Sequence, residues 1–522
     1  MLQNIRTTYY RTFDRYDEFE NVRRDFKTTV LPIFPKTNSQ TSEMIEKLAS
    51  QLGKPADKRW FGVRHIQVFL AFYLMFIAYG LRVNLSVGIV AMTDPKASPN
   101  PEIPTFPEWK DTSVILSSFF WGYLPPQAFA GQLAKKYGPK WFLVSAMLIC
   151  CLFTYLLPVL ASKYGSAGVM FCRIMQGVGQ GFVYPMIHDL LSKWVPPSER
   201  SRMGTYVYAG GSLGTVVSML LTGILSGSWW GWPSLFYTYG TITLIWILLM
   251  AYFGSNDPSE HKFIKEEEKL YIEKGSARTI GEKCPTPWKD IFTSWPVWSL
   301  IVVHCGQNWG FWTLMTEIPS YISGVMEYEI ESNSYLSGLP YFTLWVLSFI
   351  FSAIADFLIN HKITSIGATR KILNSIGLFV PAASLIALGF MTKEKKEAAI
   401  ALLTIAVGTN AAIYSGFNIN HIDIAPNHSG ILMAISNGAS NVCALIAPLF
   451  VQVVVTDQKD ATQWRIVFMF TASLYVVTNC VFLIFGTGEL QDWNEPKHKR
   501  KANDIFRTAQ ITAPPQPTIK TC

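Results

Sequence analysis

Long runs of apolar residues constrain the fold of this chain more than any other feature. Twelve of them approach the roughly 20 residues that a helix needs to cross a bilayer. They cover residues 65–92, 112–133, 141–161, 166–190, 203–226, 234–254, 296–323, 335–358, 371–391, 397–420, 429–454 and 464–486. Only 15% of the 522 residues are charged, whereas about a quarter are charged in a soluble globular protein. Because backbone groups in lipid must be hydrogen-bonded within the protein, we expect an all-α membrane protein.

The loops and tails carry most of the charge, and their distribution predicts the orientation. Residues 1–60 form a polar tail, 61–254 a first group of six spans, 255–295 a central loop, 296–488 a second group of six spans, and 489–522 a basic tail. One side of the membrane receives most loop cations, namely Lys135, Lys136, Lys140, Lys193, Arg200, Arg202, Lys362, Arg370 and Lys371. Positive loops face the cytoplasm, so both termini are expected there. The net charge of +8 is spread over these loops and does not predict binding of nucleic acid.

Short motifs recur in the two halves. Trp232-x-x-Leu-Phe236 is repeated as Trp464-x-x-Val-Phe468, and Gly181-Phe182 as Gly416-Phe417. Two six-span halves related in parallel are the organisation of the major facilitator fold, which places its substrate site near the midplane. In the central loop, residues 259–274 have a serine cap, early acids and later lysines, so a surface helix is expected there.

Two arginines lie inside spans that are otherwise apolar, Arg82 in the first span and Arg173 in the fourth. A cation in hydrocarbon costs about 2.5–3.5 kcal/mol on insertion scales, so it normally faces an aqueous cavity or a partner. No acidic residue lies within two turns on either helix. Arg82 lies about 15 Å before the end of its span and Arg173 about 11 Å after the start of its own. In antiparallel helices both would reach the same depth, and an anion is the simplest group to bind between them.

A polar stripe follows the fourth span. Arg173, Gly177, Gln180, Tyr184 and His188 recur at steps of three or four residues and share one helix face. The stripe either lines a cavity or forms hydrogen bonds with neighbouring helices. His188, near the cytoplasmic end, has two equal interpretations, a structural hydrogen bond and proton-linked gating.

Other spans contribute further polar candidates. Tyr123 and Tyr208, in spans two and five, are amphipathic and by default form interhelical hydrogen bonds. Gln307 and Asn308 in span seven either coordinate an ion or ligand through neutral dipoles or simply pack. Asn418 in span ten is too polar for lipid contact and must line a cavity, bridge helices or lie at the interface.

A charged group lies at the cytoplasmic end of the second half. We expect Asp356, with Arg370 and Lys371 beyond it, to form a charge cluster that stabilises one conformation. No nucleotide-binding loop, metalloprotease motif or nucleophile elbow occurs in the sequence, so we expect no enzyme activity, metal or organic cofactor. Uphill transport would therefore draw on an ion gradient.

Several segments together resemble solute carrier family 17, which comprises sodium–phosphate cotransporters, vesicular glutamate transporters and sialin. They are LRVNLSVGIVAM, SSFFWGYLPPQ, RIMQGVGQGFVYPMIHDLLSKWVPPSERSRMGTYVYAGGSLGT, EEEKLYIE, PTPWKDIFTSWPVW and GFNINHIDIAP…GILMAISNG, within a similarity over about residues 60–493. The resemblance implies twelve spans and transport of anions coupled to Na⁺ or H⁺. The family's central arginines match Arg82 and Arg173, and its tyrosines of spans two and five match Tyr123 and Tyr208.

The chain departs from the vesicular and lysosomal members at several positions. Gln180 replaces a glutamate, Leu116 stands where vesicular glutamate transporters have a histidine, and Gln307 where they have an arginine. Lys135 replaces the superfamily's acidic residue after span two, whereas its second-half counterpart survives as Asp356. The loss of a side chain that exchanges protons at Gln180 weakens the case for proton coupling.

These features favour Na⁺-coupled cotransport of inorganic phosphate by alternating access, in the plasma membrane rather than a lysosomal or vesicular one, by a monomer. The alternative is a carrier of an organic anion such as sialate, glutamate or urate, driven by H⁺ or the membrane potential. A non-transporting scaffold is disfavoured, because it has no reason to bury two arginines.

Overall fold

The computed structural model describes residues 61–93, 99–109, 112–273, 285–326, 330–391, 393–457 and 459–495. Within them, every regular element is an α-helix or a 3-10 helix. The expected tail 1–60, and residues 496–522 of the expected tail 489–522, lie outside the described residues.

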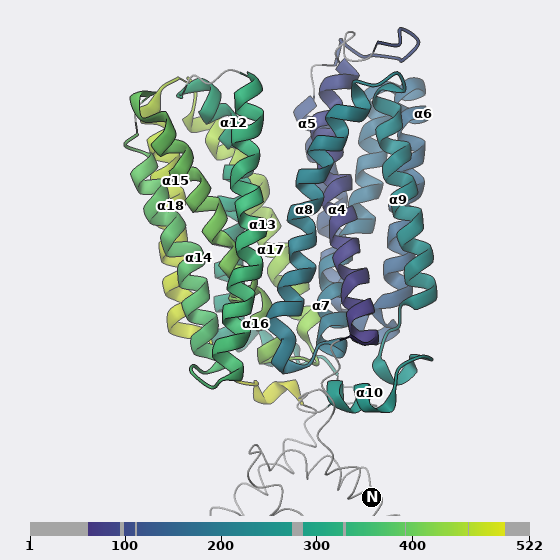
Figure 1. Ribbon diagram of the computed structural model, residues 1–522, viewed down its shortest axis with the longest axis vertical. Helices are drawn as coiled ribbons and strands as arrows, with labels where there is room; N and C mark the ends of the chain where they lie inside the picture. Colours follow the sequence, from purple (N-terminus) through teal and green to yellow (C-terminus); the bar gives the residue numbers. More distant parts are fainter. Residues whose placement is uncertain are drawn as a thin grey trace, which may run out of the picture.

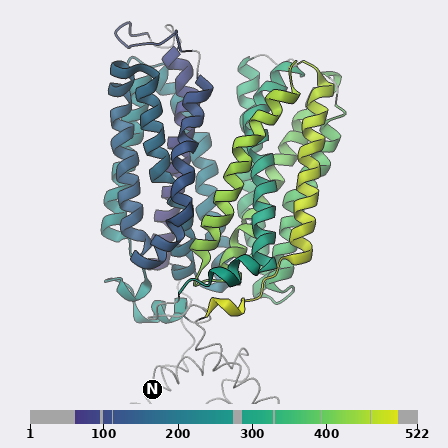
Figure 2. The same cartoon turned by 180° about the vertical axis from the view of Figure 1, so that it is seen from behind.

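Two bundles of long helices stand side by side (Figures 1 and 2). The first contains α4 (Val63–Thr93), α5 (Thr112–Tyr137), α6 (Pro139–Gln180), α7 (Val183–Trp194), α8 (Arg200–Ser226) and α9 (Gly231–Phe253). The second contains α12 (Trp295–Gly324), α13 (Ile330–Asn360), α14 (Ile366–Leu388), α15 (Lys396–Thr409), α16 (Phe417–Ile424), α17 (Ser429–Val454) and α18 (Ala461–Phe485). Shorter helices are α10 (Glu266–Glu273), α11 (Trp288–Thr293) and the 3-10 segments η4 (Pro197–Glu199), η5 (Pro258–Glu260), η6 (Lys393–Lys395), η7 (Asn410–Tyr414) and η8 (Asp492–Asn494).

Among the described residues, nine helical segments are long and apolar enough to cross a membrane. One of them, Pro139–Trp194, is 56 residues long and holds two passes. Gly165 separates these passes, because its backbone has φ 61° and ψ −142° inside α6. Beyond it the chain folds back, since Gln176 donates to Thr154 at 3.0 Å. With α5 and α12, which are also long helices of the two bundles, the described residues provide the twelve passes expected of a major facilitator protein.

The recurring Gly-Phe pairs mark breaks at corresponding places in the two halves. Gly181-Phe182 separates α6 from α7, and Gly416-Phe417 separates η7 from α16. At Gly181 a Cβ atom would lie 2.7 Å from the Tyr123 carbonyl oxygen of α5, so only glycine fits the approach. The fourth pass is therefore built from the end of α6 and from α7, and the tenth from α15, η7 and α16.

The helix expected over 259–274 is shorter than predicted, and it does not lie free on the surface. Only Glu266–Glu273 form α10. The buried Glu268 carboxylate accepts from the Val63 and Arg64 amides at 3.0 and 3.1 Å and forms an ion pair with the Arg64 guanidinium at 3.1 Å. The first amides of α4 have no partner within the helix and attract a carboxylate, so α10 covers this helix end.

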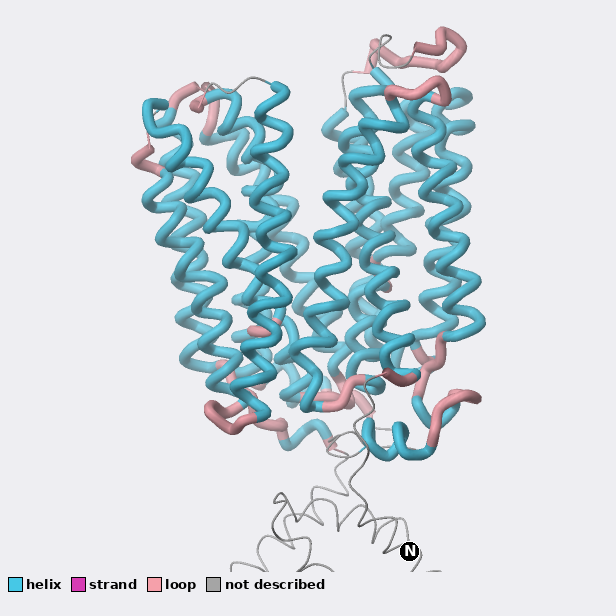
Figure 3. Tube along the Cα trace, in the orientation of Figure 1, coloured by secondary structure: helices cyan, strands magenta, loops and turns pink. Residues whose placement is uncertain are grey.

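The halves meet closely at the end of the molecule where α10 lies. There, Arg200 pairs with Asp423 at 2.9 Å, Lys135 Nζ lies 2.9 Å from His428 Nδ1, and Asn360 donates to the Ser198 carbonyl. The ribbons of the two halves diverge toward the opposite end (Figure 3).

Candidate functional site

Arg82 lies among aromatic rings in the first bundle. Its guanidinium carbon is 5.1 Å from the ring centroid of Tyr79 and 5.0 Å from those of Phe119 and Tyr123. Nη2 donates to Gln180 Oε1 at 3.3 Å, and Nε has no hydrogen-bond partner. The residue is only 8% exposed, and it forms no ion pair with any described residue.

Arg173 is bonded quite differently. Its Nη1 donates to the Leu81 carbonyl at 2.9 Å and to Gln176 at 3.2 Å, and its Nη2 donates to the Arg82 carbonyl at 3.0 Å. Each helix carbonyl has a second lone pair for such a bond. Arg173 thus fastens α6 to α4 at the level of Arg82, and the two arginines are neighbours as their depths predict.

The two cations share one aromatic neighbour. The guanidinium carbons of Arg82 and Arg173 lie 5.0 and 5.1 Å from the Phe119 ring centroid. A cation–π contact contributes about 0.5–2 kcal/mol, which offsets only part of the cost of burying each charge. Within the described part of the chain, neither arginine has a carboxylate partner. An anion with at least two oxygens would complete this site, because a guanidinium presents paired donors to carboxylate or phosphate.

Of the two predicted tyrosines, only Tyr123 lies at the arginine pair. Its hydroxyl accepts from Asn437 Nδ2 of α17 at 3.0 Å and so links the two halves. Tyr208 lies farther along a row of tyrosines, where the Tyr79 and Tyr184 hydroxyls are 2.7 Å apart and the Tyr184 and Tyr208 rings are stacked at 5.8 Å.

His188 is fully buried between the halves. Its Nε2 lies 3.0 Å from the Asn418 carbonyl, and its Nδ1 contacts the Tyr208 hydroxyl. A carbonyl only accepts, so Nε2 carries the proton and a neutral ring accepts from Tyr208 at Nδ1. His421 Nδ1 bonds the same carbonyl at 3.0 Å. The predicted residue Asn418 thus contributes its backbone oxygen here, and His188 forms the structural bonds of its first interpretation.

The span-seven candidates are not in direct contact with the arginine pair. Asn308 donates to Ser440 Oγ of α17 at 2.8 Å, whereas Gln307 is buried and forms no hydrogen bond with a described residue. Ser440 lies one turn from Asn437, within a polar stripe of α17. This stripe was missed, although its spacing was visible in an otherwise apolar span: Ser436, Asn437, Ser440 and Asn441.

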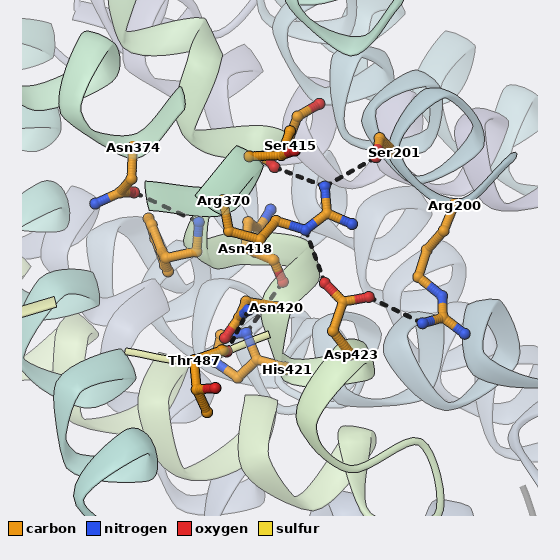
Figure 4. A network of polar contacts seen from close by, with 12 residues as sticks. Arg200, Ser201, Arg370, Asn374, Ser415, Asn418, Asn420, His421, Asp423 and Thr487 are labelled. Carbon is orange, nitrogen blue, oxygen red and sulfur yellow. Dashed lines mark hydrogen bonds and ion pairs between the residues drawn. The ribbon is translucent and has the colours of Figure 1, made fainter. Parts of the chain in front are cut away.

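The charge cluster at the α10 end differs from the expected one. The carboxylate that pairs with Arg370 is Asp423, at 2.7 Å, and Figure 4 shows Asp423 between Arg370 and Arg200. Asp356 instead accepts from the Ser201 and Arg202 amides at 3.1 and 2.9 Å, at the start of α8. Free amides at a helix start favour a carboxylate, which explains the different partner. Lys371 forms no ion pair with a described residue.

Comparisons with known proteins agree with the fold. The family model described as Major Facilitator Superfamily matches residues 68–448. The chain is 39% identical over 482 residues to a Drosophila melanogaster protein named "Putative inorganic phosphate cotransporter", covering 88% of this chain and 91% of that one. It is 34% identical to human sialin, over 82% of this chain and 90% of sialin. It is 36% identical to vesicular glutamate transporter 3 of Danio rerio, over 81% and 72%.

A solved structure resembles the fold. The proton:xylose symporter XylE matches with a TM-score of 0.63 at 14% identity, over 82% of this chain and 97% of that chain. The helices in two bundles are those of a multi-pass membrane protein, and the matching family and relatives are transporters. The chain belongs to the major facilitator superfamily and, within it, to solute carrier family 17.

Proposed function

We propose that this chain carries inorganic phosphate across the plasma membrane, coupled to Na⁺, by alternating access. The observation that supports this proposal is the pair of buried guanidiniums without a carboxylate partner. A substrate with negatively charged oxygens gains hydrogen bonds to charged donors that are poorly satisfied without it. The name of the Drosophila melanogaster relative points to the same substrate.

Gln180 supports Na⁺ rather than H⁺ as the coupling ion. Its side-chain oxygen accepts from Arg82 at 3.3 Å, so a neutral amide occupies the place where a carboxylate would neutralise the arginine. A neutral amide does not titrate and cannot exchange a proton with the site. Arg82 therefore keeps its full positive charge for the substrate.

The test is uptake of labelled phosphate by the purified chain in liposomes, with an inward gradient of Na⁺ or of choline. We expect uptake to fall at least about tenfold in choline, and a similar loss in Na⁺ with Arg82→Ala. Arg465→Ala is the matched control, because this arginine donates to Gly389 in the second half, away from the site. Normal uptake in choline would reject Na⁺ coupling, and normal uptake by Arg82→Ala would reject the anion site.

A second candidate is an H⁺-driven carrier of an organic anion. Buried imidazoles favour it: the His188 and His421 rings lie 5.6 Å apart, and those of His421 and His304 6.3 Å apart. Under this alternative, a pH gradient without Na⁺ drives uptake, and labelled glutamate or sialate replaces phosphate as the transported species.

The proposed orientation places both termini in the cytoplasm. Epitope tags at residues 1 and 522 should become accessible to antibody only after the plasma membrane is permeabilised. Labelling of intact cells, or tagged protein found only in vesicles or lysosomes, would contradict the proposed topology or location.

A further inference from the structure

A group of buried neutral oxygen atoms lies in the first bundle, between α4, α8 and α9. Asn84 Oδ1, Thr222 Oγ1 and the Tyr239 hydroxyl each have no hydrogen-bond partner. All three residues are at most 1% exposed. The three helices pack on one another, and they run side by side in Figure 1.

The packing of α4 on α8 brings Asn84 to the level of Thr222. Ser218 Oγ donates to the Gly80 carbonyl at 3.1 Å, across a separation of 138 positions. The same separation of 138 positions relates Phe76 to Gly214: a Cβ atom added at Gly214 would lie 2.2 Å from the Phe76 carbonyl oxygen. One turn beyond Gly80 and Ser218, this register pairs Asn84 with Thr222.

The packing of α4 on α9 brings Tyr239 to the same place. A Cβ atom at Gly80 would lie 3.4 Å from the Tyr239 hydroxyl, and one at Gly88 would lie 4.0 Å from the Thr222 methyl group. Asn84 is four residues from each glycine and therefore shares their helix face. Asn84 thus lies on the face of α4 that contacts Tyr239 of α9 and Thr222 of α8.

The lack of partners is unusual for these residue types. Two other buried threonine hydroxyls of α8 and α9 donate to the carbonyl four residues earlier: Thr215 to Gly211 at 3.1 Å, and Thr243 to Tyr239 at 2.8 Å. Thr222 forms no such bond, although the Ser218 carbonyl lies in the same relation to it. Buried polar atoms without partners are destabilising, so a group that binds them explains why they are retained.

We propose that these oxygens form a binding site for Na⁺, which deepens the proposed function and rests on it. Asn84, Thr222 and Tyr239 would supply three neutral ligands. The Ser218 hydroxyl would supply a fourth, since a hydroxyl that donates to Gly80 keeps its lone pairs. Ca²⁺ and Mg²⁺ prefer carboxylates, and no three acidic, histidine or cysteine side chains of the described residues are placed to hold a metal ion together. Neutral oxygens alone therefore favour a hard monovalent cation.

The position of this site explains coupling to the anion. Asn84 is two residues from Arg82 on α4, on a different helix face. Arg173 donates hydrogen bonds to the carbonyls of Leu81 and Arg82, in the part of α4 next to both the proposed Na⁺ site and the proposed anion site. A cation at Asn84 would fix the packing of α4 on α8 and α9, and so fix the helix that presents Arg82 to the substrate.

The test is binding of radioactive ²²Na⁺ to the purified full chain in lipid nanodiscs. Wild type should bind Na⁺ saturably, and Thr222→Val should raise the dissociation constant at least about tenfold. Thr215→Val is the matched control and should stay within about twofold, because its hydroxyl is satisfied within its own helix. Tyr239→Phe removes a single hydroxyl and provides a second variant if Thr222→Val does not fold.

The outcomes separate this site from the proposed function. Absence of saturable Na⁺ binding by wild type, or wild-type affinity in folded Thr222→Val and Tyr239→Phe, would overturn the site and leave a buried water as its occupant. Saturable binding lost in these variants supports the site even if phosphate is not the substrate. The substrate is tested separately, by phosphate uptake with Arg82→Ala.

Discussion

Arg82 and Arg173 carry the same charge, but their bonding assigns them different roles. Arg173 donates to two backbone carbonyls of α4 and to Gln176. Arg82 has one long bond, to Gln180, and the Nε atom of each arginine has no hydrogen-bond partner. In the proposed site, Arg173 would therefore position α4, whereas the Nη1 and Nη2 donors of Arg82 have fewer protein partners and would bind the substrate. The sequence predicted both residues as site candidates, because burying an arginine in a membrane span is costly. It could not distinguish their roles, because the carbonyl acceptors of Arg173 lie 91 and 92 positions away.

Lysine substitutions should separate the two roles. Lysine keeps the charge but lacks the planar fork of donors. We expect Arg173→Lys to lower Tm by several degrees and to reduce phosphate uptake, because α4 and α6 lose a bridge. Arg82→Lys should raise KM for phosphate about tenfold with little change in Tm. Differential scanning fluorimetry and uptake kinetics measure the two effects, and equal changes in Tm would contradict the assignment.

A second prediction at this scale concerns the neutral charge of Gln180. Gln180→Glu would place a carboxylate where the amide oxygen accepts from Arg82. The carboxylate would compete with the substrate for the guanidinium, and KM for phosphate should rise at least about tenfold. Gln180→Met is the neutral control and should change KM by no more than about threefold. A similar KM in both variants would show that packing, rather than charge, matters here.

At the scale of the helices, the apolar runs predicted the passes because lipid requires internally bonded segments of fixed length. The Gly-Phe pairs were visible as a repeat, but the breaks they mark in the fourth and tenth passes were not predicted. The breaks depend on tertiary packing: Gly181 lies against the Tyr123 carbonyl of α5. The pairing of Arg370 with Asp423 was missed for a related reason, since Asp423 is 53 positions away and Asp356 is nearer in sequence.

Alanine at the first break tests this packing. In Gly181→Ala the new Cβ would lie 2.7 Å from a backbone oxygen and 3.0 Å from Pro126 Cβ. We expect a loss of about 1–3 kcal/mol in the free energy of unfolding. Gly223→Ala is the control on α8, where nothing lies within 4 Å of the added atom. It should be neutral or stabilise by up to about 1 kcal/mol, because alanine favours a helix interior. Thermal unfolding of both variants in detergent measures the difference, and equal Tm values would contradict the interpretation.

For the whole molecule, a buried ion-pair network at the α10 end joins the two halves in this conformation. Arg200 of the first half and Arg370 of the second both bind Asp423, and Arg370 also donates to Ser201 at 2.8 Å. All four groups are buried. The proposed alternating access would require this end to open, and the network would then break in each cycle.

Asp423→Asn should shift the molecule toward opening at this end. Removal of the carboxylate leaves two buried arginines without their partner, a change that costs about 3–5 kcal/mol for a buried pair. Spin labels at the exposed positions Lys136 and His361, one in each half, report the separation by electron–electron resonance. We expect a longer and broader distance distribution than in wild type. Asp457→Asn, at an exposed loop residue, is the control, and identical distributions in all three proteins would contradict the role of the network.

The contact of Glu268 with the first amides of α4 has a consequence for regulation of transport. The connector between the halves contacts the start of α4, the helix that contains Arg82. Val63 and Arg82 are about 28 Å apart along this helix. Phosphorylation near Glu268, or binding of another protein to this connector, would weaken the contacts of Glu268 with the Val63 and Arg64 amides. The position of α4, and with it that of Arg82 in the proposed site, would then change. The connector would thus allow transport to be regulated at the expected cytoplasmic end of the protein without a separate regulatory domain.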